Sequence, residues 1–259
     1  MEFKKKDIVE TGFSSSELYT DTRQKQINIS NVDVGSIVAF EWAQKERPMV
    51  FQDIWYFQGR EPVIVSRYTL QLPPNWTAKA VTFNHAEIAP AIVNNSYTWE
   101  LSNLAPIARE TRMPSLRQVS PWLAVSYSPP PNLQGYRAIQ SWQDVSRWYT
   151  SLAGPQAELN DEIASQARQA VSAESSLLEK LRAVSRYVQK KIRYVAIEIG
   201  IGGYRPHAAG QIFRNGYGDC KDKVILMQAR LKALGITSFP VLVYSGDADR
   251  VRPEFPSVR

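Results

Sequence analysis

The chain has 259 residues, of which 44% are hydrophobic and 11% aromatic, so it is not an intrinsically disordered protein and is long enough for two domains with separate cores. Its one cysteine excludes an internal disulfide, and one cysteine with two scattered histidines lacks the ligand spacing of a zinc site, so we expect no metal and no cofactor. The net charge of +6 accompanies no nucleic-acid-binding motif, and no apolar run approaches the ~18 residues that span a bilayer, so we expect neither a nucleic-acid partner nor a membrane span.

The first half of the chain predicts short β-strands separated by turns. The segments SYTWEL and WLAVSY alternate apolar with other residues, and Val63 and Val65 precede a face formed by Tyr68 and Leu70. A period of two is typical of strands that bury one face of a sheet. Because the breaks GREP, LPPNW and NNS fall at suitable intervals, we expect an antiparallel β-sandwich and, for the whole chain, an α+β fold.

Four aromatic residues of this half have two open interpretations, a ligand groove or a hydrophobic core. They are Trp42, Trp55, Tyr56 and Trp76. Large aromatic side chains more often fill a core, so we expect these four to be core residues.

The segment SPPPNLQG at residues 128–135 predicts a linker, because three consecutive prolines cannot join the hydrogen-bond ladder of a sheet. We place the β-sandwich domain at residues 1–128, the linker at 129–136 and a second domain at 137–259. Both domains are long enough to form a core of their own.

The second domain begins with two segments that we expect to be helical, SWQDVSRWYTSLAG and PQAELNDEIASQARQAV. Ser176 and Glu179 then form a capping-box pattern, which predicts a helix that ends near Lys191. The segment RYVAIEI directly after this helix predicts a strand.

A further helix is predicted from residue 220 to 234 in the stretch RNGYGDCKDKVILMQARLKALG. Its apolar positions recur at three- and four-residue spacing: Val224, Met227, Leu231 and Leu234. Asp219 can serve as the N-cap, because its carboxylate can accept the N–H of Asp222, and Gly235 supplies a left-handed stop. Arg230 lies off the apolar stripe.

Cys220 is the first candidate functional residue because it stands where this helix begins. The first-turn N–H groups of a helix are unpaired and partly positive, so they favour a thiolate, which is the nucleophilic form of cysteine. Lysines and arginines around this loop would also favour a thiolate and attract acidic substrates, although a basic run such as Lys190 and Lys191 is more commonly just a solvated helix face. A cysteine on an apolar face is commonly just a small buried hydrophobe, so the residues alone leave both roles of Cys220 open.

The segment KIRYVAIEIGIGGYRPHAAGQIFRNGYGDCKDKVILMQARLKALGI resembles the core of bacterial transglutaminase-like proteins, in which a GDCKDK turn leads into the cysteine helix. Upstream, DVGSIVAFEW, DIWYFQGREPVIVSRYTLQLPPNW and YTWELSNLAPIARETRMP resemble the domain of unknown function 3857. The resemblance implies a papain-like α+β fold for the second domain and a Cys, His, Asp triad in that chain order. It also implies that Cys220 is the nucleophile of acyl transfer or amide hydrolysis, acting on a protein, peptide or peptidoglycan-like amide.

The histidine of such a triad is the missing part. Both histidines of the chain, His85 and His207, precede Cys220, whereas the family pattern places the histidine and the aspartate after the cysteine. The chain stops at PEFPSVR, about where the resemblance implies a strand that carries FNH, so we expect a fragment whose second domain is incomplete at its C-terminus and inactive by itself. His207 is expected at the entry to a short helix, with either a structural role or a place in the cleft.

Two alternatives remain beside the enzyme hypothesis. In one, the chain is a non-catalytic binding or scaffold module of the bacterial cell envelope, and Cys220 is a relic sealed beneath other side chains. In the other, a histidine of another chain completes the site, although the sequence leaves the oligomeric state open. Related proteins often carry a signal peptide, so the resemblance implies a periplasmic or envelope location, although MEFKKKDIVE lacks the apolar middle of such a signal.

Overall fold

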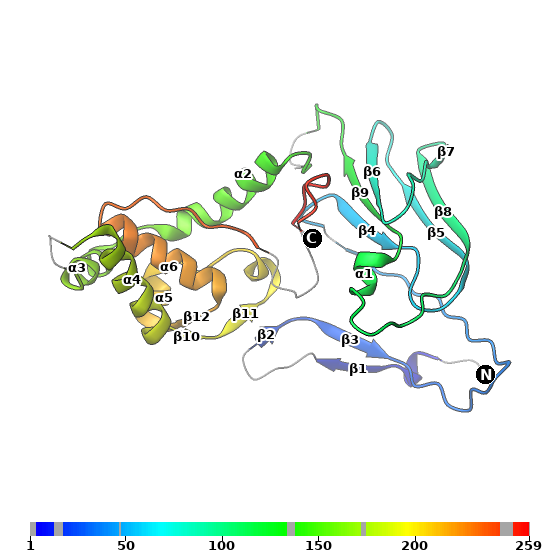
Figure 1. Ribbon diagram of the computed structural model, residues 1–259, viewed down its shortest axis with the longest axis horizontal. Helices are drawn as coiled ribbons and strands as arrows, with labels where there is room; N and C mark the ends of the chain where they lie inside the picture. The colour runs from blue at the N-terminus through cyan, green and yellow to red at the C-terminus, as the bar shows by residue number, and fades with distance from the viewer. Residues whose placement is uncertain are drawn as a thin grey trace. The chain divides into compact units, whose positions relative to one another are not determined.

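The structure is a computed structural model that describes residues 4–12, 18–46, 48–133, 138–171, 175–243 and 251–258. It contains antiparallel sheets in the first half of the chain and a group of helices in the second, which confirms the predicted α+β class (Figure 1). Contacts divide the chain into two compact units, and each is described by itself. The sheet unit comprises Gln44–Arg147 with Leu242–Arg259, and the helical unit comprises Met1–Ala43 with Trp148–Val241.

The sheet unit contains two antiparallel sheets of three strands, in the orders β4-β9-β6 and β5-β8-β7. Its elements are β4 (Gln52–Tyr56), β5 (Val63–Gln71), β6 (Thr77–Phe83), β7 (Ala91–Val93), β8 (Ser96–Leu104), the short helix α1 (Leu116–Val119) and β9 (Trp122–Ser128). The strands β5, β8 and β9 coincide with the three segments whose alternation predicted them.

One hydrophobic core joins these two sheets. Trp99 of β8 and Leu123 and Val125 of β9 are buried together in it. Hydrogen bonds also cross from one sheet to the other. Trp55 Nε1 donates to Ser66 Oγ at 3.1 Å, and the Tyr68 hydroxyl donates to a carboxylate oxygen of β4 at 3.0 Å. Trp55 and Tyr68 can therefore pack against this core, because the polar group of each has a partner.

The strand β9 is buried on both faces at its start, contrary to the prediction of one buried face. Trp122–Val125 are all buried, because Phe255 packs against the outer face beside Phe83 and Ala124. The segment around Phe255 is also held by polar contacts, since Gln52 Nε2 donates to the Pro256 carbonyl at 2.7 Å. The alternation of residues within β9 cannot predict the packing of Phe255 on its outer face, because residues 251–258 lie more than a hundred positions downstream.

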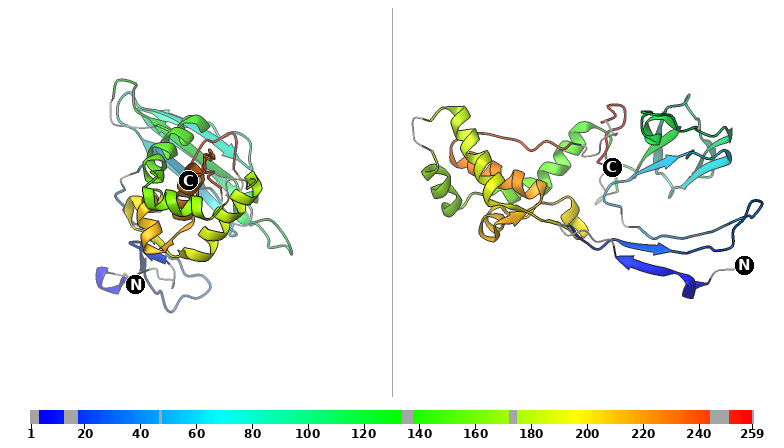
Figure 2. Two further views of the ribbon diagram at one scale, coloured as in Figure 1. Left: turned by 90° about the vertical axis from the view of Figure 1, so that its left-hand side faces the viewer. Right: turned by 60° about the horizontal axis from the view of Figure 1, so that its bottom comes forward.

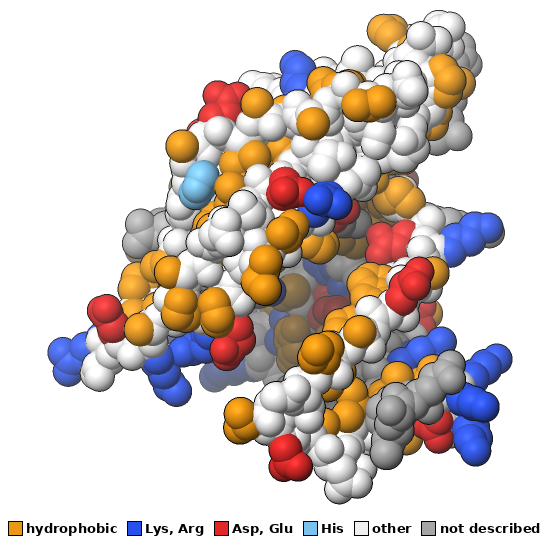
Figure 3. Space-filling model, turned by 90° about the vertical axis from the view of Figure 1, so that its right-hand side faces the viewer, with side chains coloured by type: hydrophobic (Ala, Val, Ile, Leu, Met, Phe, Trp, Pro, Cys, Tyr) orange, Lys and Arg blue, Asp and Glu red, His pale blue; other side chains and the backbone are white. Residues whose placement is uncertain are grey.

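The prediction that the four aromatic residues are core residues is correct for one and wrong for two. Trp55 packs against the shared core, whereas Trp42 is 71% exposed. Tyr56 is also exposed, and Trp76 is half-buried, with its ring 5.1 Å from that of Phe51. Figure 3, which views the molecule from the right-hand side of Figure 1, shows hydrophobic side chains at the surface between charged ones.

The helical unit is built around α6 (Cys220–Ala233), which packs against α3 (Asp161–Gln169), α4 (Leu177–Lys191) and α5 (Ala209–Asn215) (Figure 2). Three short ladders accompany the helices: β10 pairs parallel with β12, β11 pairs parallel with β2, and β1 pairs antiparallel with β3. The remaining elements are η1 (Lys5–Asp7), β1 (Val9–Gly12), β2 (Leu18–Thr20), β3 (Arg23–Gln26), η2 (Gly154–Ala157), β10 (Arg193–Tyr194), β11 (Ala196–Glu198), η3 (Gly200–Gly203) and β12 (Tyr217–Gly218), together with α2 (Trp142–Ala153), which begins in the sheet unit.

The bounds of α4 and α6 follow the local signals of the sequence. The Ser176 hydroxyl accepts the N–H of Glu179, and the Glu179 carboxylate accepts the N–H of Ser176 at 2.7 Å, so α4 begins with the predicted capping box and ends at Lys191. At the other end of α6, Gly235 has a φ of +74°, and its N–H donates to the Lys232 carbonyl. Glycine adopts this left-handed conformation without steric cost and ends the helix.

The predicted apolar face of α6 is partly wrong. Val224 is 41% exposed, whereas Arg230, which was expected off the buried stripe, is fully buried. The surrounding helices explain its burial, because the Arg230 guanidinium donates to Gln166 Oε1 of α3 and lies 3.8 Å from the ring centroid of Tyr187 of α4. Arginine can occupy this buried position because the Gln166 side chain accepts a hydrogen bond from it and the Tyr187 ring lies against its guanidinium group.

Asp144, in the first turn of α2, has a carboxyl group whose pKa is lowered. Asp144 accepts hydrogen bonds from the hydroxyl and the N–H of Ser141 at 2.8 and 2.9 Å. The hydrogen bond from the Ser141 side chain, followed by that from Arg147, lowers the pKa of Asp144 to about 2. Because this folded-state pKa lies below the unfolded value of about 3.9, Asp144 stabilises the fold above about pH 4, and this contribution is lost as the pH falls through 2.

The substitution Asp144→Asn is therefore expected to lower the free energy of unfolding by about 1 kcal/mol at pH 6, a modest value because the carboxylate is partly solvated. The difference from the unsubstituted chain should shrink steadily between pH 4 and pH 2. Urea unfolding of both proteins at pH 6, 4 and 2 measures this. A difference that is the same at all three values would show that the charge of Asp144 is not involved.

Candidate functional site

The start of α6 is built from two aspartates that cap each other. Asp219 is the N-cap, and its carboxylate accepts the N–H of Asp222 at 3.2 Å, while the Asp222 carboxylate accepts the N–H of Asp219 at 3.2 Å. Both side chains are almost fully buried, and Lys221 forms an ion pair with Asp219. The first turn of the helix, which contains Cys220, is therefore fixed on both sides by reciprocal hydrogen bonds.

The residue before this cap must be glycine. A Cβ atom at Gly218 would lie 2.6 Å from the Cβ and 2.8 Å from a carboxylate oxygen of Asp222. Gly218 is also the end of the short parallel ladder, in which it is the register partner of Tyr194 and accepts the N–H of Val195 at 3.1 Å. The ladder thus brings Tyr194 beside the turn that leads into Cys220.

Cys220 is exposed at the first position of α6. Burial, and after it a charge interaction with Cys220, raises the pKa of Tyr194, so this phenol stays protonated. Burial and then Cys220 likewise raise the pKa of Tyr149 of α2. Cys220 therefore lies near two phenols, and the first-turn N–H groups of α6 lie beside it.

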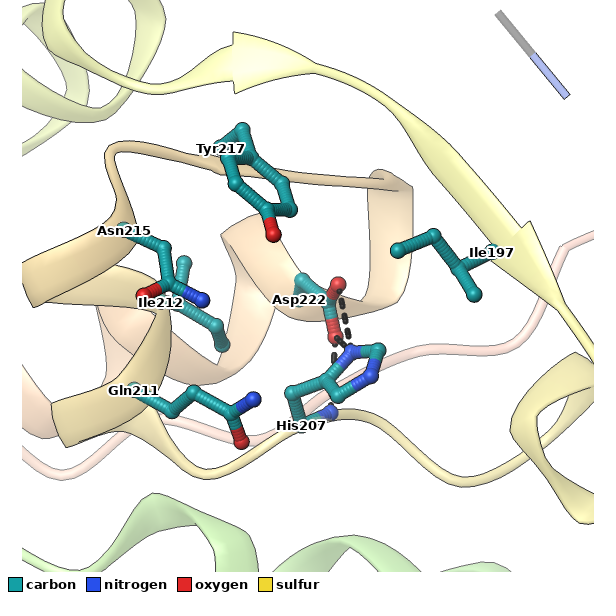
Figure 4. Close-up of a pocket in the computed structure, with 7 residues that line it drawn as sticks. All are labelled: Ile197, His207, Gln211, Ile212, Asn215, Tyr217 and Asp222. Atoms are coloured by element: carbon teal, nitrogen blue, oxygen red, sulfur yellow. Dashed lines mark hydrogen bonds and ion pairs between the residues drawn. The ribbon is translucent and has the colours of Figure 1, made fainter. Parts of the chain in front are cut away.

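His207 lies directly before α5 and contacts Asp222 rather than Cys220. Its backbone N–H donates to Asp222 Oδ1 at 2.8 Å, and its Nδ1 lies 3.1 and 3.2 Å from the two carboxylate oxygens. Figure 4 shows this pair at one side of a small pocket. The pocket is lined by Ile197, His207, Gln211, Ile212, Asn215, Tyr217 and Asp222.

The structure thus places Cys220 and Asp219 together at the start of α6. His207 contacts Asp222 of the same helix turn. His85 belongs to the sheet unit, where its Nδ1 lies 2.9 Å from the carbonyl of Ala86. Within the part of the chain that the structure describes, no hydrogen bond or ion pair joins a histidine to Cys220.

The sequence did not lead us to Tyr194, nor to the hydrogen bond that the Asp222 carboxylate accepts from the N–H of Asp219. The two aspartates three positions apart could have indicated a reciprocal cap, because this is the spacing of a capping box. Nothing in the local sequence could have indicated Tyr194, since it reaches Cys220 through a ladder between strands 23 residues apart.

Two further properties bear on the kind of site. In the described ranges, no cluster of three or more histidine, cysteine, aspartate or glutamate side chains is placed to hold a metal ion. None of the helices that the structure describes has the length and apolar character needed to cross a bilayer.

Comparisons with known proteins bear on the fold and the family of the chain. No curated protein matches the chain. The chain is similar to a crystal structure described as a "putative protease" from Parabacteroides distasonis, with a TM-score of 0.52, 16% sequence identity and 74% of this chain covered. The chain spans 36% of the length of that protein, so the likeness shows a shared fold over about a third of it.

Two family descriptions match in succession. Residues 2–108 match the domain of unknown function DUF3857, and residues 164–254, which contain α6 and the candidate site, match the transglutaminase-like superfamily. The order of the two regions is the order that the sequence motifs indicated. The candidate site at the start of α6 therefore lies in the region of this chain that matches the transglutaminase-like superfamily, and the region that matches DUF3857 precedes it.

Proposed function

We propose that Cys220 is the nucleophile of a transglutaminase-like thiol site that transfers or hydrolyses an acyl group. The observation that carries this proposal is the exposed position of Cys220 in the first turn of α6, with the phenol of Tyr194 near it. A cysteine sealed beneath other side chains would instead favour the scaffold alternative.

The chemistry follows from these groups. The thiolate sulfur attacks the carbonyl carbon of an amide, the C–N bond breaks, and the amine leaves after it takes up a proton. An amine or a water molecule then attacks the resulting thioester and restores the thiol. The N–H of Cys220 is placed to stabilise the oxyanion of each tetrahedral intermediate, because it belongs to the unpaired first turn of the helix.

The proton acceptor is the part that this chain does not supply to Cys220. Both histidines precede it in the sequence, and His207 is engaged by Asp222. The proposal therefore includes that Cys220 reacts as an activated thiol, whereas residues 1–259 turn over amides poorly by themselves.

The substrate class is the amide of a protein, a peptide or a peptidoglycan-like polymer. The family match supports an acyl-group chemistry, and the description of the similar structure as a "putative protease" supports a peptide bond. The chemistry of the site requires only an accessible carbonyl, so the proposal does not distinguish these three polymers.

The rate of alkylation of Cys220 by iodoacetamide at pH 7, compared with that of a free tripeptide thiol, tests the proposal. Cys220 should react faster than the tripeptide, because the first-turn N–H groups of α6 favour the thiolate. Mass spectrometry reports the single alkylated residue directly, since the chain has one cysteine. A rate equal to or below that of the tripeptide would overturn the proposal.

The variant Tyr194→Phe measures the contribution of the phenol. Losing a donor to a charged group at a partly exposed position should slow alkylation at pH 7 by about fivefold. Tyr217→Phe is the matched control, because Tyr217 lies in the neighbouring strand with similar exposure, 38% against 43%, but lines the pocket on the side of Asp222. Equal slowing in both variants would contradict a direct role of Tyr194.

A further inference from the structure

The buried carboxylate of Asp222 gathers an unusual number of donors. It accepts the N–H of Asp219, the backbone N–H of His207 and a hydrogen bond from the His207 ring. Asp222 is only 2% exposed, so its charge is stabilised by these donors rather than by water. Two of the three donors come from His207, which is 15 positions away in the chain.

The ring of His207 has a defined orientation. A carboxylate accepts hydrogen bonds and donates none, so the nitrogen that faces it, Nδ1, carries the hydrogen. Nε2 is the other ring nitrogen, and it has no partner drawn in Figure 4, while the His207 side chain is 35% exposed. His207 therefore has one nitrogen that faces Asp222 and one that does not.

The position of Asp222 on the helix separates His207 from the thiol. Two residues along an α-helix turn by about 200°, so the side chains of Cys220 and Asp222 leave opposite sides of α6. His207 packs on the side of Asp222 and is not placed to take the proton of Cys220. Any influence of His207 on Cys220 must act through the first turn of the helix.

We infer that His207 is a positioning residue: through Nδ1–H and its backbone N–H it holds the carboxylate of Asp222, which in turn holds Asp219 and fixes the first turn of α6 around Cys220. The inference rests on the proposed function and adds a residue to it. The competing role is a base or ligand-binding group in the pocket, which would require Nε2 instead of Nδ1.

Two amide substitutions separate these roles. In His207→Asn the amide branches at Cγ, as the ring does, and its N–H lies near the place of Nδ1, whereas in His207→Gln the N–H lies near the place of Nε2. His207→Ala provides neither. We expect His207→Asn to keep the Cys220 alkylation rate at pH 7 within about twofold of the unsubstituted chain, and the Gln and Ala variants to lose about tenfold.

The outcomes are distinct. Rescue by Gln rather than Asn would overturn the inference in favour of a pocket role for Nε2, and three variants that all react like the unsubstituted chain would overturn it in favour of no coupling. If the Ala and Gln variants do not fold, as judged by circular dichroism, His207→Asn decides alone. This variant must fold and keep the Cys220 alkylation rate of the unsubstituted chain. An unsubstituted chain that already reacts like free cysteine would instead refute the proposed function.

Discussion

Cys220→Ser is expected to abolish covalent acylation of the chain. Incubated with p-nitrophenyl acetate at pH 7, the unsubstituted chain should gain one acetyl group on Cys220, because a thiolate attacks an activated ester without a base. A serine hydroxyl remains neutral at this pH, so the adduct at residue 220 should form at least about 100-fold more slowly. Intact-protein mass spectrometry followed by peptide mapping measures both rates.

The control for this experiment is the unsubstituted chain blocked with iodoacetamide. Cys220 is the one cysteine, so blocking it removes the same nucleophile without a change of sequence. Any acetylation that persists in the blocked chain belongs to lysines and is subtracted. Equal acetylation at residue 220 in the cysteine and serine forms would contradict a role of the thiol.

Gly218→Ala is expected to destabilise the helical unit by about 2 to 4 kcal/mol. The new methyl group would lie 2.6 Å from Asp222 Cβ, so the side chain must move and its buried carboxylate loses hydrogen bonds. Urea unfolding followed by circular dichroism measures the loss. Alkylation of Cys220 in the native variant should also slow, because the first turn of α6 is no longer held.

The matched control is Gly203→Ala. A Cβ at Gly203 meets nothing within 4 Å, so this substitution should change the free energy of unfolding by less than about 1 kcal/mol. Similar losses in the two variants would mean that the effect of Gly218→Ala comes from the backbone and not from Asp222.

Local signals predicted much of the candidate site. The cap at Asp219, the beginning of the helix at Cys220 and its stop at Gly235 depend on residues within a few positions of one another, and these are interactions that the chain forms wherever the segment is placed. The same holds for the capping box of Ser176 and Glu179. Such elements can be predicted from one sequence because their partners are neighbours in it.

Contacts between distant segments could not be predicted in this way. The pairing of His207 with Asp222 depends on how the loop before α5 packs against α6, and the burial of Arg230 depends on α3 and α4. Spacing within the helix placed Val224 on the apolar face, but Val224 is exposed. Spacing alone does not show which sides of α6 the neighbouring helices cover. The packing of Phe255 on the outer face of β9 is also outside the reach of periodicity.

The most direct test of the account compares Cys220 with itself in the folded and the urea-unfolded chain. At pH 7 the folded chain should be alkylated several-fold faster, because only the folded chain has the first-turn N–H groups and the Tyr194 hydroxyl beside the sulfur. A free tripeptide thiol measured in the same two solutions corrects for the effect of urea on the reagent. Equal or slower alkylation of the folded chain would contradict the claim that the fold activates Cys220.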